Sequence, residues 1–82
     1  MTEEKARVAV GLSVVEITKY LMNYFSISHE EAYKKLVDTD FFERLNDIET
    51  GLYLETDQYL CKACILEIEQ GKASMYEFIN AE

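Results

Sequence analysis

Apolar residues in the first 25 positions recur at the three- and four-residue spacing of an α-helix. Val10, Ile17 and Leu21 belong to one stripe, and a second stripe runs beside it. The pattern predicts a helix over about residues 3–24, capped by Thr2. Because its apolar arc exceeds the 100° or so that one neighbour covers, we expect it to contact two neighbours or a second chain. The residues expected to face a second copy of the chain are Val8, Gly11, Leu12, Val15 and Met22.

Capping signals divide the middle of the chain into shorter helices. Ser28 and Glu31 form a capping box that begins a helix over about 29–37, with Tyr33 among its core-facing residues. Residues 38–40 are candidate caps for a third helix, and Gly51 is its expected end.

The last third of the chain predicts two more helices. Leu52–Leu54 is expected to be an extended or irregular apolar connector. A helix over about 57–70 follows, with Gly71 as its stop. Ser74 and Glu77 have the spacing of a second capping box, which predicts a short final helix starting there. The sequence therefore predicts one all-α domain over residues 1–82, in which three or four shorter helices pack on a long N-terminal helix as a single small bundle.

Charge along the chain excludes a nucleic-acid partner. The 16 acidic residues outnumber the 8 basic ones, for a net charge of −8. Residues 1–37 are balanced, whereas residues 38–69 carry nine acids against Arg44 and Lys62. Phosphate contacts require the opposite sign. A helix-turn-helix built on the second and third helices is disfavoured for the same reason.

The acidic segment is a candidate surface for a protein partner, because its carboxylates alternate with aromatic residues. Acids can steer a basic partner and aromatic side chains can anchor it. The alternative is that the acids only keep a small apolar domain soluble. The candidate partner-binding residues are Asp38, Asp40, Phe41, Asp47, Glu49, Tyr53, Glu55 and Asp57.

Cys61 and Cys64 are spaced as in redox and metal motifs, but their setting favours burial. They lie inside the predicted fourth helix, on the face that also carries Leu60 and Ile65. A redox pair is expected at a helix N-terminus, where the helix dipole lowers the thiol pKa. We therefore predict that both are core residues. The alternative is a metal or redox site that two chains share through these cysteines.

Other chemistries find little support in the sequence. A zinc site needs about four ligands, and one chain offers two cysteines and the single His29. A calcium loop starting at Asp38 would need glycine where Glu43 stands. No nucleophile or phosphate-binding loop has a recognisable motif around it. We expect no enzyme activity, catalytic residue, metal or cofactor.

Charged residues at the N-terminus and within the first helix argue against a signal peptide or a membrane span. Two cysteines only three apart do not make the disulfide framework of a small secreted protein. We expect a cytoplasmic protein without a membrane partner.

Residues 27–68 resemble a known group of proteins in their pattern. A capping serine is followed by Glu31–Leu36, then Phe41–Leu45, and then Gln58–Leu60 after a tyrosine-containing turn. The stretch is similar to a group of short bacterial all-helical proteins of unknown function, some encoded beside toxin-like or ADP-ribosyltransferase-like proteins. The resemblance implies a small companion or antitoxin-like partner of another protein. The first predicted helix also has more apolar residues than one neighbouring helix can cover. Together with the resemblance, this excess suggests a non-catalytic interaction module that associates with itself as a homodimer.

Overall fold

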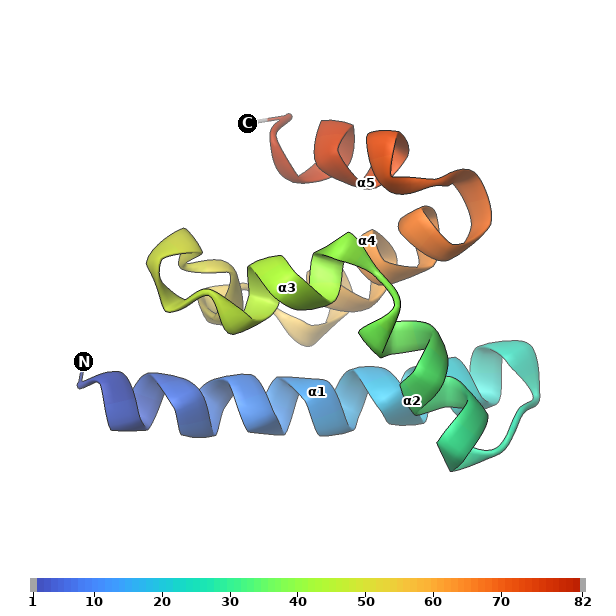
Figure 1. Cartoon of the computed structure of the whole chain (residues 1–82), viewed down its shortest axis with the longest axis horizontal. Coiled ribbons are helices and arrows are strands. Elements are labelled where there is room, and N and C mark those ends of the chain that lie inside the picture. Colours follow the sequence, from blue (N-terminus) through green and yellow to red (C-terminus); the bar gives the residue numbers. More distant parts are fainter. Residues whose placement is uncertain (1, 82) are drawn as a thin grey trace.

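The computed structural model describes residues 2–81, and all regular structure in this range is helical (Figure 1). The predicted all-α fold, with a long first helix and shorter helices packed on it, is confirmed. The elements are α1 (Glu3–Phe25), α2 (His29–Val37), α3 (Asp40–Asn46), the short 3₁₀ helices η1 (Ile48–Thr50) and η2 (Leu52–Leu54), α4 (Asp57–Gln70) and α5 (Lys72–Ile79).

α3, α4 and α5 stack on one side of α1. In Figure 1, α1 runs along the lower edge, α3 and α4 lie above it, and α5 returns over α4 at the top. α2 packs near the C-terminal end of α1, and α4 contacts both α1 and α5. α4 is therefore the central helix, and one long side of α1 remains outside the stack.

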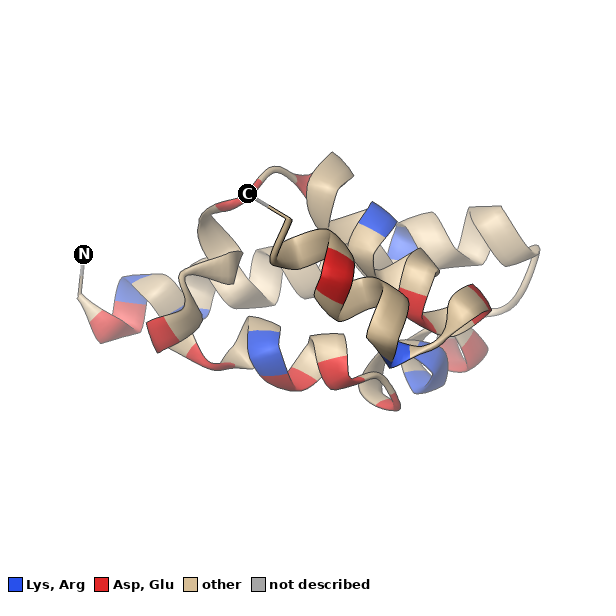
Figure 2. Ribbon diagram, turned by 90° about the horizontal axis from the view of Figure 1, so that it is seen from above, with Lys and Arg blue, Asp and Glu red and all other residues tan. Residues whose placement is uncertain are grey.

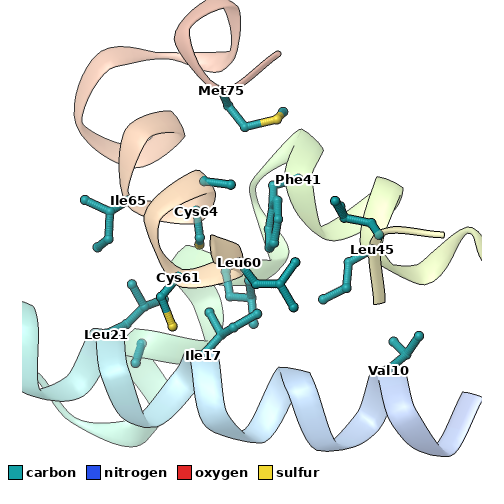
Figure 3. Close-up of a cluster of buried hydrophobic side chains, with 14 residues drawn as sticks. Val10, Ile17, Leu21, Phe41, Leu45, Leu60, Cys61, Cys64, Ile65 and Met75 are labelled. Atoms are coloured by element: carbon teal, nitrogen blue, oxygen red, sulfur yellow. The ribbon is translucent and has the colours of Figure 1, made fainter. Parts of the chain in front are cut away.

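The core forms where α1, α3 and α4 meet (Figure 3). The stripe of Val10, Ile17 and Leu21 faces inward, as predicted, and all three side chains are buried. α3 inserts Phe41 and Leu45 from the opposite side. The buried apolar residues from the remaining elements are Ala32, Leu36, Leu52, Leu60, Cys61, Ala63, Cys64, Ile65 and Met75.

A partly buried carboxylate contact ties α3 to α4. The backbone N–H of Asp40 donates to Glu67 Oε2 at 2.6 Å, and the N–H of Phe41 donates to Glu67 Oε1 at 2.8 Å. Thr39 Oγ1 accepts from the N–H of Phe42 at 3.1 Å. These three N–H groups have no partner within α3, because the first turn of any helix leaves its donors unpaired. A side chain 26 residues away thus completes the cap that Thr39 begins.

The capping box at the start of α2 is present as predicted. The N–H of Glu31 donates to Ser28 Oγ at 3.2 Å, and the N–H of Ser28 donates to Glu31 Oε1 at 3.5 Å. Both bonds are exposed.

Ser28→Ala is expected to lower the free energy of unfolding by about 1 kcal/mol, because it leaves the N–H of Glu31 without its side-chain acceptor. Urea denaturation monitored by circular dichroism measures the change. Ser26→Ala is the control, since Ser26 caps the end of α1 with its backbone only. An unchanged midpoint for Ser28→Ala would contradict a stabilising role for the box.

Four local predictions were wrong. α5 begins at Lys72, directly after Gly71, so Ser74 and Glu77 lie inside the helix and form no capping box. Gly51 ends η1 rather than α3, and Leu52–Leu54 is a 3₁₀ turn. Tyr33 is 44% exposed, because α2 is short and turns only a narrow face with Ala32 and Leu36 toward the core.

Candidate functional site

The side of α1 that faces away from the stack carries three apolar side chains left exposed by the fold. Val8 is 60% exposed, Leu12 is 64% exposed and Val15 is 50% exposed. At 3.6 residues per turn, these positions lie opposite the buried stripe of Ile17. We call Val8, Gly11, Leu12 and Val15 the outer face of α1. The apolar surplus inferred from the sequence is therefore present on the surface.

Met22, which was predicted to belong to this face, is partly buried and packs against the core. This part of α1 is also the end of the helix on which α2 packs. The outer face accordingly ends before Met22.

Gly11 has no neighbour that requires a glycine. A Cβ atom built on Gly11 would meet nothing within 4 Å apart from its own helix and adjacent residues. Glycine within a helix costs about 1 kcal/mol relative to alanine. A missing side chain on an exposed helix face does, however, allow a second helix to approach the backbone closely.

Charged residues flank the outer face without entering it. Residues 8–15 contain no charged side chain. On the N-terminal side Arg7 pairs with Glu3 at 3.2 Å, and on the C-terminal side Lys19 pairs with Glu16 at 3.8 Å. All four side chains are more than half exposed, so these pairs are weak and free to rearrange.

The structure does not bring the eight candidate partner-binding residues together. Asp47, Glu49 and Tyr53 line a hollow of about 610 Å³ beside the N-terminus of α1. Glu55 lines a smaller hollow of about 190 Å³, and Asp57 lines a groove elsewhere. In Figure 2, acidic positions recur along α3 and the turns after it. The basic residue within α3 is Arg44.

Phe41 was wrongly placed on this surface, because it is fully buried. Asp40 is half-buried and forms hydrogen bonds within the chain. Its Oδ2 accepts from the Tyr76 hydroxyl at 3.2 Å, and its N–H donates to Glu67. Asp38 remains exposed. Part of the acidic segment therefore contributes to the core and to hydrogen bonds within the chain. The alternation of acids and aromatics in the sequence could not reveal this.

Cys61 and Cys64 are buried and unbridged, as predicted for core residues. Figure 3 shows the Cys61 sulfur directed toward α1 near Leu21 and Ile17, and Cys64 within the same cluster. Burial raises the pKa of the Cys61 thiol to about 11, with a smaller contribution from Asp57. Burial likewise raises the pKa of the Cys64 thiol to about 12, with Cys61 as the second cause. Neutral, enclosed thiols are poor nucleophiles and poor metal ligands, which weighs against a shared metal or redox site.

The raised thiol pKa values predict that stability falls at alkaline pH. In the unfolded chain the thiols titrate near pH 8.5. Above that pH the unfolded state releases protons that the folded state retains, so the stability from neutral thiols is complete below about pH 8.5 and is lost as pH rises toward 11. Denaturation midpoints between pH 8 and 10.5 should therefore fall more steeply for the parent chain than for the Cys61→Ala/Cys64→Ala variant. Equal slopes, or rapid labelling of the native thiols at pH 8, would contradict their burial.

A groove of about 690 Å³ between α1 and α4 was not foreseen. Its α1 wall includes Tyr20, which stacks on Tyr24 with ring centroids 5.9 Å apart. No sequence signal could have located it, because it depends on which two helices lie side by side. The lining residues are Glu16, Lys19, Tyr20, Asn23, Asp57, Gln58, Cys61, Lys62, Ile65 and Leu66.

Within residues 2–81, no three His, Cys, Asp or Glu side chains gather closely enough to hold a metal ion. None of the helices described is both long and apolar enough to cross a membrane.

The fold and its surface thus define a small all-α domain with one uncovered apolar helix face. Comparison with models of protein families, with characterised proteins and with solved structures found no match for the chain.

Proposed function

We propose that this protein is a non-catalytic interaction module that associates with itself as a homodimer through the outer face of α1. The observation that carries the proposal is the exposure of Val8, Leu12 and Val15, each at 50% or more, on one face of one helix. Contiguous apolar surface of this kind marks sites of association more often than free surface.

A two-fold dimer is the simplest association that covers the outer face. In such a dimer the same patch serves both chains, so each copy buries the surplus of the other. Net charge does not oppose it, because residues 1–37 carry equal numbers of acids and bases. The acidic excess lies in residues 38–69, on elements of the stack rather than on the outer face.

Sedimentation equilibrium at micromolar concentration and moderate salt tests the proposal. We expect about twice the 9.5 kDa chain mass for the parent protein. Val15→Glu should give a folded monomer, because it would bury a charge in the interface. Ala73→Glu is the matched control, since it adds the same charge at an exposed position on α5 and should leave the dimer intact. A parent chain that sediments as a 9.5 kDa monomer would overturn the proposal.

Gly11→Ala separates an interface from a merely exposed face within the same experiment. In an isolated chain the added methyl group meets no neighbour, so the variant should gain up to about 1 kcal/mol of stability from helix propensity. In a dimer that crosses at Gly11, the methyl group would instead push the second helix away. We expect a weaker dimer with an unimpaired fold.

A further inference from the structure

We infer that the two α1 helices of the proposed homodimer run antiparallel, in the register that places Leu12 of each chain over Gly11 of the other. This inference rests on the proposed function and specifies its geometry. In this register, residues whose numbers sum to 23 lie opposite one another across the two-fold axis.

The register matches side chains by size. Leu12 is the most exposed apolar side chain of the outer face, and Gly11 beside it has no side chain and no neighbour within 4 Å of its Cβ position. A projecting leucine needs a recess in the facing helix, and glycine provides one. Val8 then lies opposite Val15 of the second copy, so the apolar positions meet apolar positions.

The register also matches charge. Glu4 and Lys19 lie on the outer side of α1, about one turn beyond Val8 and Val15 respectively. Their numbers sum to 23, so Glu4 of each chain faces Lys19 of the other. Lys19 can reach this partner because its pair with Glu16 is long, at 3.8 Å, and exposed.

A parallel dimer, or an antiparallel dimer in another register, does not pair opposite charges and apolar side chains in this way. In a parallel dimer, Glu4 would face Glu4 of the second copy, and Lys19 would face its own counterpart. Sliding the antiparallel pair by one helical turn sets either Val8 against Lys19 or Val15 against Glu4. Like charges and charge–apolar contacts oppose association, so complementarity selects one register.

Disulfide trapping tests the direction of the helices. In the antiparallel register, Val8 and its counterpart lie about 10 Å apart along the axis, since they are offset by seven residues. The Val8→Cys chain and the Val15→Cys chain should therefore not link to themselves under mild oxidation. An equimolar mixture of the two should yield a covalent heterodimer. The parent chain is the control, because Cys61 and Cys64 are buried and should remain unlinked.

Charge reversal provides the second measurement. Glu4→Lys and Lys19→Glu should each weaken the dimer by about tenfold, because each replaces two attractive pairs per dimer by repulsive ones. The double variant should restore parental affinity, because it exchanges the two charges. Glu77→Lys and Lys72→Glu, at exposed positions of α5, are the controls because they change the net charge by the same +2 and −2.

The outcomes distinguish the two proposals. A dimer in which the Val8→Cys chain or the Val15→Cys chain links to itself would overturn the antiparallel register and leave the proposed function standing. A dimer that links in no combination would also overturn it and would direct attention to the groove between α1 and α4. A monomeric parent chain would overturn the proposed function, and this arrangement with it.

Discussion

Phe41→Ala is expected to lower the free energy of unfolding by about 3–5 kcal/mol, the largest effect of any single substitution considered for this chain. Phe41 is fully buried between α3 and α4, so its removal costs both the transfer energy of the ring and the cavity left behind. Domains of this size are stable by only about 5–15 kcal/mol. The variant should thus be largely or wholly unfolded at 37 °C, as circular dichroism melting at fixed protein concentration will show.

Phe42 offers a matched control one residue away. Its ring packs at the edge of the core and is only partly buried. Phe42→Ala should cost about 1–2 kcal/mol, because less apolar surface returns to water. Phe41→Leu, which keeps much of the volume, should fold and allow a quantitative comparison. Equal losses for Phe41→Ala and Phe42→Ala would contradict the assignment of Phe41 to the core.

Glu67→Ala is expected to cost about 2–3 kcal/mol, because it leaves two N–H groups at the start of α3 without an acceptor. The Asp40 and Phe41 amides donate to the two carboxylate oxygens at 2.6 and 2.8 Å. Hydrogen bonds to a charged acceptor contribute about 1.5–3 kcal/mol, and unpaired buried donors carry a penalty of similar size. Urea denaturation measures the change.

Glu69→Ala is the control on the same helix. Its carboxylate accepts from the Tyr24 hydroxyl at 3.1 Å, but this contact is exposed to solvent and should contribute little to stability. Glu67→Gln should fall between the two, since the amide keeps one acceptor and turns an NH₂ group toward the other donor. Similar losses for Glu67→Ala and Glu69→Ala would rule out the capping role of Glu67.

The two candidate surfaces differ in how well the sequence predicts them. The outer face of α1 was predicted nearly completely, because a helix with too many apolar residues must leave some of them exposed whatever it packs on. Met22 was the exception, since it packs against the core at the end of the helix on which α2 packs. The acidic surface was predicted less accurately. An alternation of acids and aromatics carries no information on which way each side chain points, and Phe41 points inward.

The sequence by itself determined the features that depend on neighbouring residues. These are the extent of α1, the capping box of Ser28, the stop at Gly71 and the inward face of α4 with its two cysteines. Helical period, side-chain caps and glycine conformation act over a few residues, so a local pattern is enough to predict them.

Only the tertiary structure decided that Phe41 is buried, that Glu67 caps α3, and that α1 and α4 enclose a groove. Each of these depends on contacts between residues that are far apart in the chain. Such contacts are chosen by the packing of the whole core, in which every helix competes for the same interior volume. The stripe with Ile17 and Leu21 occupies that interior, and the stripe with Leu12 is left outside because none of the helices within residues 2–81 covers it.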